Sequence, residues 1–175
     1  MFLNPEEIIK ELNLDEGMIV ADFGCGAGFY SIPAARLVGS SGRVYALDVR
    51  KEALDVVRSQ SRQARLLNIE TIRANLEELH GSSIKDQAVD RVIISNILFQ
   101  VDQKTELIAE AYRILKPRGL VMVVEWEKGA GISVPPSANL VSKETAAELF
   151  ISSGFTTEKE FSAGSHHYGL IFRKP

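Results

Sequence analysis

The sequence predicts an α/β fold: a doubly wound, mostly parallel sheet of seven strands with helices on both faces and a C-terminal antiparallel hairpin. Short apolar runs alternate with helix-like segments along most of the chain, which is typical of this architecture. The run Val89–Ser95 is almost continuously β-branched, as expected of a strand covered on both faces. The last two runs, 156–162 and 167–173, flank Gly164 with no helix between them, which predicts the hairpin.

Capping signals and apolar runs place the elements of the first half. Asn4 followed by Pro5 and Glu7 predicts the start of a short helix. Its apolar stripe consists of Ile8, Ile9 and Leu12. Strands are expected at 18–23, 43–48 and 69–74, helices at 28–38 and 51–67, and a helical turn near 76–80. The inward positions of the longer helix are Leu54, Val57, Ala64 and Leu67.

The second half continues the alternation. Asp102 is expected to cap a helix over 103–115, followed by a strand at 120–126. The Gly- and Pro-rich segment 129–137 is expected to be a loop. Ser142 should cap a last helix that ends at Gly154. With 175 residues and no repeat, the chain is expected to form one domain over 1–175.

Composition disfavours several functional classes. The net charge is −3 and no basic run exceeds two residues, so nucleic-acid binding gains no electrostatic support. A single cysteine fits a reducing compartment. No signal peptide is recognisable, and no apolar stretch approaches the roughly eighteen residues of a membrane span, so we expect a cytoplasmic protein without membrane contact. No cysteine or histidine spacing is typical of a metal site.

The segment Val20–Gly28 indicates a nucleoside site. It is an apolar run that ends in Asp22 and then in Gly24, Gly26 and Gly28. Glycine is used where a ligand must approach the main chain, and the following helix begins with unpaired N–H groups. About twenty residues later a second apolar run ends in Asp48, which can accept both hydroxyls of a ribose.

The identity of the nucleoside stays open on these residues alone. The dinucleotide pattern is G-x-G-x-x-G, whereas this chain has G-x-G-x-G with Asp22 just before the turn. An acid there repels a pyrophosphate and suits an amino group, such as that of S-adenosylmethionine. The spacing therefore leans against NAD without excluding it. Cys25 lies inside the turn, where a small space-filling residue is expected more than a reactive thiol.

Further motifs make the chain resemble a known family. D-F-G-C-G-A-G at 22–28 resembles the first motif of class I S-adenosylmethionine-dependent methyltransferases. The later segments 42–48, 90–96, 115–119 and 142–155 resemble, in order, that family's ribose strand, substrate-side strand, L-K-P-G-G turn and last helix. The resemblance runs from about residue 18 to the C-terminus and is nearest to the small type 11 branch similar to the ubiquinone and menaquinone biosynthesis enzymes. It implies a Rossmann-like sheet. Arg118 replaces a glycine of the usual turn.

The resemblance also implies roles for the donor side. Asn75 stands where the family has an acid that accepts from the adenine amino group, and an amide oxygen can accept the same bond. The main-chain N–H of Leu76 is expected to meet the adenine ring, with Val49 and Arg50 covering it or packing only as a loop. Ser95 lies at the strand end beside the expected sulfonium.

Candidates for the acceptor side are less specific. Asn96 is expected to hold the acceptor or to form a turn, and Tyr30 to present its ring to the sulfonium ahead of Phe29 and Phe99, or to be core. His167 is a candidate general base or a solvated strand end. Glu125 and Glu127 end a strand on the substrate side. A carboxylate there is expected to accept a proton or pair with a cationic acceptor, or to be only a charged strand end.

The resemblance predicts methyl transfer from S-adenosylmethionine to a small-molecule acceptor. In-line displacement depends mainly on alignment, so no dedicated acid–base pair is required. Two alternatives stay open: a non-catalytic S-adenosylmethionine-binding partner subunit, and an NAD-dependent oxidoreductase. The acceptor and the oligomeric state are not readable from the sequence, although a homodimer is compatible with it.

Overall fold

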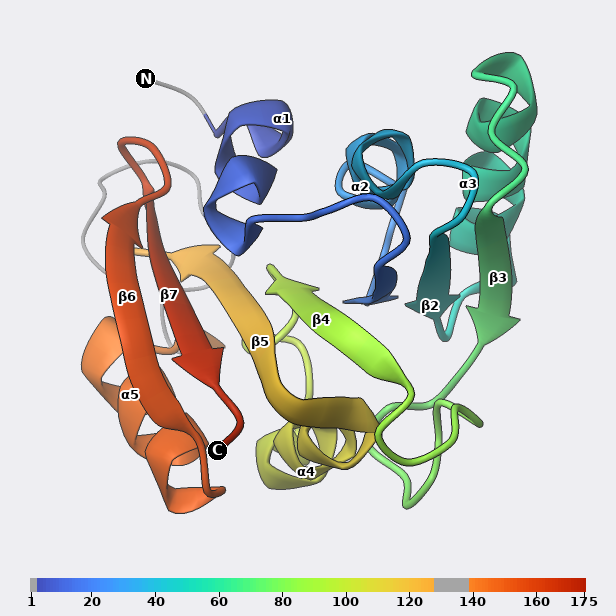
Figure 1. Cartoon of the computed structure of the whole chain (residues 1–175). Coiled ribbons are helices and arrows are strands. Elements are labelled where there is room, and N and C mark those ends of the chain that lie inside the picture. The colour runs from blue at the N-terminus through green and yellow to red at the C-terminus, as the bar shows by residue number, and fades with distance from the viewer. Residues whose placement is uncertain (1–2, 128–138) are drawn as a thin grey trace.

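The computed structural model describes residues 3–127 and 139–175. One mixed sheet of seven strands forms its centre, in the order β3-β2-β1-β4-β5-β7-β6. The strands are β1 (Ile19–Phe23), β2 (Arg43–Asp48), β3 (Ile69–Arg73), β4 (Val89–Ser95), β5 (Leu115–Trp126), β6 (Thr156–Ser162) and β7 (His167–Arg173). Neighbouring strands are parallel except that β7 runs antiparallel to both β5 and β6. The predicted fold and hairpin are confirmed (Figure 1).

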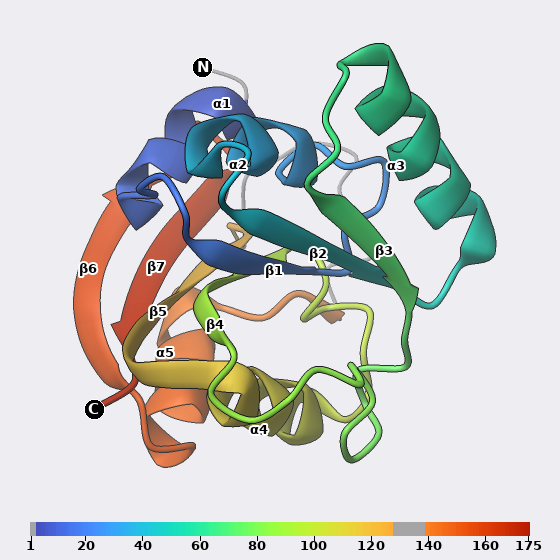
Figure 2. The same ribbon diagram turned by 45° about the vertical axis from the view of Figure 1, so that its right-hand side comes forward.

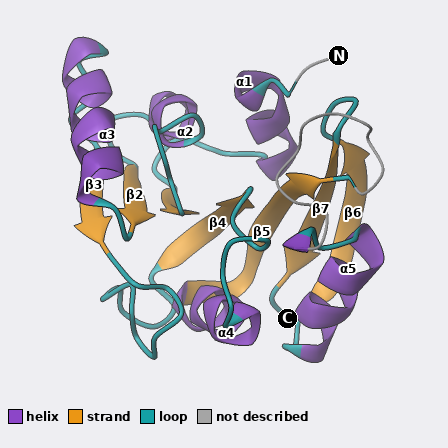
Figure 3. Ribbon diagram, turned by 180° about the vertical axis from the view of Figure 1, so that it is seen from behind, coloured by secondary structure: helices purple, strands orange, loops and turns teal. Residues whose placement is uncertain are grey.

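Helices cover both faces of the sheet. They are α1 (Pro5–Ile8), the 3-10 turn η1 (Ile9–Leu12), α2 (Ser31–Val38), α3 (Lys51–Gln63), α4 (Lys104–Ile114) and α5 (Lys143–Ser152). Figure 2 shows α1, α2 and α3 on one face and α4 and α5 on the other, and the view from behind in Figure 3 agrees. No helix in the described part of the chain is both long and apolar enough to cross a bilayer.

The central strands are buried on both sides, as the β-branched run predicted. Ile93 of β4 packs in the core under α1 and α2, whereas its neighbours Val92 and Ile94 pack in the core over α4 and α5. All three side chains are fully buried. This alternation fixes the sheet between two helical layers and leaves the carboxyl ends of β1, β2 and β4 free to form a site.

Two predicted caps are confirmed. The Asn4 side chain accepts from the Glu6 N–H at 3.2 Å, and Ser142 Oγ accepts from the Thr145 N–H at 3.2 Å. The predicted cap at Asp102 is wrong. The main-chain N–H groups of Asp102 and Gln103 both donate to Glu77 Oε1 at 2.7 Å, so a carboxylate distant in sequence performs that task.

Several predicted boundaries are also corrected. The helix expected over 51–67 ends at Gln63, because Arg65 adopts a left-handed conformation with φ 56°. Leu67, expected to face inward, is 99% exposed. Strand β5 begins at Leu115 rather than near 120, directly after α4 and with a register shift against β4. Residues 76–80 form turns rather than a helix, and the expected loop 129–137 lies outside the described residues.

Candidate functional site

Two adjoining hollows lie at the carboxyl ends of the parallel strands. The β2–β3 hollow has a volume of about 350 Å³ and is lined by Gly24, Asp48, Val49, Arg50, Ala74, Asn75, Leu76, Glu77, Ile97, Gln100 and Val101. The β1–β4 hollow has a volume of about 410 Å³ and is lined by Leu3, Pro5, Asp22, Gly24, Cys25, Gly26, Ala27, Phe29, Tyr30, Arg50, Ser95, Asn96 and Gln100. Three residues, Gly24, Arg50 and Gln100, line both. Together the two hollows form one crevice at this edge of the sheet. The residues predicted to bind the methyl donor line this crevice, except Gly28.

The glycine turn has the backbone that its sequence predicted. Gly24 and Gly26 have φ of 67° and 51°, in the left-handed region that favours glycine. A Cβ atom on Gly24 would lie 2.5 Å from Cδ1 of Ile97, so a larger residue there would require the Ile97 side chain to move. The Gly26 N–H donates to Asp48 Oδ2 at 3.0 Å, which ties the turn to the end of β2.

Asp48 is a buried carboxylate held in its ionised form. Besides Gly26, it accepts from the Arg50 N–H at 2.9 Å and from the Arg50 guanidinium at 3.2 and 3.3 Å. Burial opposes ionisation, but the hydrogen bonds from Arg50 and Gly26 hold the pKa of Asp48 below its ordinary value. Its position fits the predicted ribose acid.

Asp22 is buried without a counter-charge. It is 2% exposed, it accepts a 2.5 Å hydrogen bond from Ser31 Oγ, and no described cation pairs with it. Burial, reinforced by the charge of Asp48, raises the pKa of Asp22 to about 7. A ligand ammonium group would supply the missing charge.

Two further buried groups in the β1–β4 hollow carry unsatisfied polar atoms. Neither Tyr30 Oη nor Asn96 Oδ1 finds a hydrogen bond of ordinary geometry within residues 3–127 and 139–175, although Tyr30 lies beside Ser95. Such atoms are costly unless a ligand or water pairs with them. Burial raises the pKa of Tyr30, so its hydroxyl stays protonated. Asn96 also has φ 54°, a strained conformation for a non-glycine residue.

Glu125, a candidate for a substrate-facing carboxylate, is instead internal. It is 1% exposed, and its Oε1 accepts from the N–H groups of Ile97 and Leu98 at 2.8 and 2.7 Å. Burial raises its pKa to about 7. It therefore holds the loop after β4, and the prediction that it faces the substrate is wrong.

His167 does not join the crevice. It lines a separate hollow with Glu127 and Lys143, and its ring packs against that of Trp126, with centroids 4.0 Å apart and the ring planes inclined by 36°. Burial and the adjacent His166 lower its pKa to about 4. The structure gives the expected general base no contact with Tyr30 or Asn96.

The residues predicted to contact adenine line the β2–β3 hollow, but one of them, Asn75, already forms hydrogen bonds within the chain. Asn75 Oδ1 accepts from the Glu77 N–H at 3.2 Å, and its amide donates to Glu78 Oε1 at 2.8 Å. An amide oxygen has a second lone pair, so acceptance from adenine stays a prediction. Glu77 was not foreseen. The segment 74–79 resembles the stretch of the methyltransferase family that binds adenine, and only this resemblance points to Glu77.

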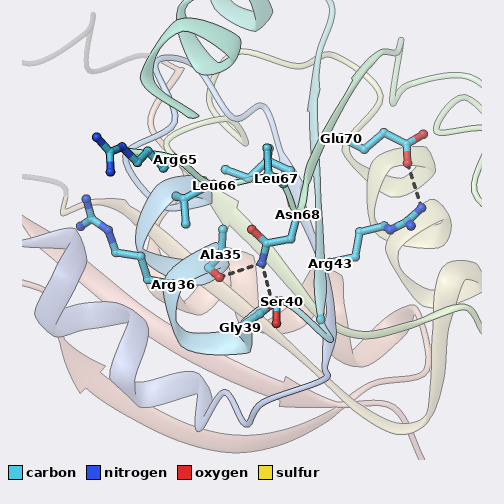
Figure 4. Close-up of a pocket in the computed structure, with 12 residues that line it drawn as sticks. Ala35, Arg36, Gly39, Ser40, Arg43, Arg65, Leu66, Leu67, Asn68 and Glu70 are labelled. Carbon is cyan, nitrogen blue, oxygen red and sulfur yellow. Dashed lines mark hydrogen bonds and ion pairs between the residues drawn. The ribbon is translucent and has the colours of Figure 1, made fainter. Parts of the chain in front are cut away.

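A hollow larger than either the β2–β3 or the β1–β4 hollow, of about 570 Å³, lies at the other end of β2 and β3 (Figure 4). Asn68 spans it by donating to the carbonyls of Ala35 and Gly39 at 2.8 Å each. Arg36 and Arg43 already pair with Glu6 and Glu70, respectively. Because this hollow lacks the glycine turn and both buried aspartates, size alone does not locate the nucleoside site.

Comparison with known proteins agrees with the geometry of the crevice. Residues 14–164 match the family described as a methyltransferase domain. The chain belongs to this family. Demethylmenaquinone methyltransferase of Geobacillus sp. (strain WCH70) is 32% identical over 120 residues, which are 69% of this chain and 50% of the relative. This methyltransferase therefore spans about half the length of the curated relatives it matches.

Solved structures extend the likeness to the whole described fold. A SAM dependent methyltransferase from Aquifex aeolicus has a TM-score of 0.90 at 25% identity, over 99% of this chain and 90% of that chain. A putative type 11 methyltransferase from Sulfolobus solfataricus has a TM-score of 0.80 at 27% identity, over 99% of this chain and 94% of that one. The chain thus belongs to the class I S-adenosylmethionine-dependent methyltransferases and is related to the quinone-biosynthesis branch.

The residues present fit that cofactor. Asp22 is an acid without a counter-charge, Asp48 is an ionised acid beside a glycine turn, and Tyr30 and Asn96 hold buried polar atoms without partners. S-adenosylmethionine has three parts that need such groups at this edge of the sheet. Its ammonium needs an acid like Asp22, its ribose an acid like Asp48, and its reactive centre polar atoms like those of Tyr30 and Asn96.

Proposed function

We propose that this methyltransferase transfers the methyl group of S-adenosylmethionine to a small-molecule acceptor by in-line displacement, and that the acceptor is a quinol-type ring. The observation that carries the proposal is the junction of two hollows at Gly24. One contains the ionised Asp48, and the other contains the unpaired polar atoms of Tyr30 and Asn96. The name of the Geobacillus relative supports the acceptor class.

When bound, S-adenosylmethionine would supply an electrophilic methyl group on its sulfonium. Transfer would break the carbon–sulfur bond as the acceptor's nucleophilic atom bonds to the carbon, and the acceptor would lose a proton to solvent. The chain supplies alignment. Asp48 holds the ribose, Asp22 the ammonium, and Asn75 with the Leu76 N–H the adenine. Tyr30 and Asn96 orient the acceptor, and the buried walls exclude water. Because His167 lies elsewhere, we assign no general base.

Labelled-methyl transfer tests the proposal. The chain is incubated with methyl-labelled S-adenosylmethionine and reduced naphthoquinones that lack the ring methyl, beside a panel of phenols, amines and thiols. We expect label in the quinol fraction, and little label with Asp48→Ala. Binding of S-adenosylhomocysteine without transfer to any acceptor would favour a non-catalytic partner subunit. Tight NADH binding with no response to S-adenosylhomocysteine would favour an oxidoreductase.

A further inference from the structure

All acceptor positions of Asp48 are filled by the chain itself. A carboxylate offers two oxygens with about four lone-pair positions. Oδ1 accepts from the main-chain N–H and from Nε of Arg50, at 2.9 and 3.2 Å. Oδ2 accepts from the Gly26 N–H and from Nη2 of Arg50, at 3.0 and 3.3 Å.

These four bonds divide into a fixed pair and a movable pair. The two main-chain donors belong to the glycine turn and to the residue that caps α3, so they stay with the fold. The other two come from one planar guanidinium, whose fork matches the two carboxylate oxygens. A ribose would bring two neighbouring hydroxyls, which need the same two positions.

The Arg50 guanidinium can move away from Asp48 without disturbing the packing of the protein. The Arg50 side chain is 66% exposed, whereas that of Asp48 is 5% exposed. Glu52, in the first turn of α3, adds a second attraction for the guanidinium from outside the crevice. The guanidinium can therefore swing into water while the carboxylate keeps both main-chain bonds.

We propose that Arg50 is a built-in occupant of the ribose position, which a nucleoside with a vicinal diol must displace. Arg50 is then a residue that sets donor affinity, although it does not hold the donor. The inference rests on the proposed function, since it takes the donor's ribose as the competing ligand. It also explains why Arg50 lines both hollows: the guanidinium lies at their junction, in front of Asp48.

Calorimetric titration with S-adenosylhomocysteine tests the displacement. Arg50→Met removes the guanidinium and keeps a stem of similar length. Lys51→Met is the matched control, because Lys51 is the next residue, is 69% exposed and pairs with Asp55 rather than Asp48. We expect Arg50→Met to bind about three- to tenfold more tightly than the natural chain, the scale of an exposed to half-buried ion pair. Lys51→Met should change the affinity less than twofold.

The same titration at low and high salt concentration provides a second test. Added NaCl weakens the Arg50–Asp48 pair, so the advantage of Arg50→Met over the natural chain should shrink between low and high salt. Equal or weaker binding by Arg50→Met at low salt would overturn the proposal, because Arg50 would then be neutral or would support the ligand.

A measurement without nucleoside separates this proposal from the proposed function. The pKa of the Asp48 carboxyl, followed by carbon NMR, should rise in Arg50→Met and stay low in Lys51→Met. If that rise occurs but no chain binds S-adenosylhomocysteine, the proposed function fails while the Arg50–Asp48 pairing stands. If Arg50→Met and the natural chain bind S-adenosylhomocysteine equally well, the displacement proposal fails while the proposed function stands.

Discussion

Two carboxylates of the crevice, Asp48 and Asp22, are buried to a similar degree and yet differ in charge state. Four donors surround Asp48 and keep its pKa low, whereas Asp22 has one hydroxyl partner and a pKa raised to about 7. The first can accept neutral hydroxyl groups once the Arg50 guanidinium leaves, and the second gains most from a cation. This difference matches the two ends of an aminoacyl nucleoside.

Asp48→Ala should weaken binding of S-adenosylhomocysteine by about 1.5–3 kcal/mol, the cost of losing a charged hydrogen-bonding partner. Calorimetry measures the change. Asp55→Ala is a suitable control, because Asp55 lies on the exposed side of α3 and, among the described residues, pairs only with Lys51 and Arg58. An unchanged dissociation constant for Asp48→Ala would contradict the ribose assignment.

Donor binding should weaken as the pH falls below 7. With its pKa near 7, Asp22 is increasingly protonated there, and an ammonium can pair with it only after the proton leaves. The loss approaches tenfold per pH unit until the pKa of the bound state is reached. Asp22→Asn should bind S-adenosylhomocysteine more weakly at pH 8 and show a flat profile between about pH 5.5 and 8. A slope retained in that variant would assign the titration to another group.

Single residues were predictable where their role follows from the main chain. The positions of Gly24 and Asp48 could be predicted because a turn and a strand end are set by local sequence. The bond from Arg50 to Asp48 could not, since it depends on the direction of a flexible side chain. The position of His167 required the strand order, which places β7 two strands away from β4.

Among the elements, the first part of β5 contains a residue with a strained backbone, Arg118. Arg118 has φ 66°, a conformation that costs a non-glycine residue about 1 kcal/mol or more. Its N–H donates to the Lys174 carbonyl at 2.9 Å, and its own carbonyl accepts from Arg173.

Arg118→Gly should therefore stabilise the fold by up to about 1 kcal/mol, the relief of strain less the added freedom of the unfolded chain. Both main-chain hydrogen bonds are kept. Urea unfolding measures the difference. Arg118→Ala, which keeps the Cβ atom, should bring no such gain. A gain as large in the alanine variant would attribute the effect to the arginine side chain.

Element boundaries were the least predictable feature of the chain. The apolar pattern of α3 continues to Leu67, but the helix ends four residues earlier because Arg65 turns the chain left-handed. The start of α4 depends on Glu77, a contact across 25 and 26 residues of sequence. Local sequence carries little information on either event.

For the molecule as a whole, buried acids with raised pKa values reduce stability at higher pH. Glu125 binds a proton more readily in the folded chain, at a pKa of about 7, than at the ordinary 4.5 of an unfolded one. Its contribution is therefore favourable near pH 4.5 and is lost as the pH rises toward 7, with a slope of at most about 1.4 kcal/mol per unit. Asp22 acts in the same direction, and Asp48 and His167 act in the opposite one.

Glu125→Gln should flatten this decline, because a neutral amide oxygen can accept from Ile97 and Leu98 without a charge to bury. We expect the variant to gain stability relative to the natural chain between pH 5 and pH 8, measured by urea unfolding at each pH. Glu127→Gln, an exposed neighbour, is the control and should follow the natural profile. Parallel profiles for Glu125→Gln and the natural chain would refute the role of Glu125.

The sheet ends in two charged borders. On β6, Glu158, Lys159 and Glu160 are exposed and pair with Arg173, Glu11 and Lys143, respectively. On β3, Glu70 pairs with Arg43 of the neighbouring strand. A foreign strand that hydrogen-bonded to either border would have to strip water from these ion pairs. Charged rims of this kind thus oppose extension of the β-branched sheet by a further strand.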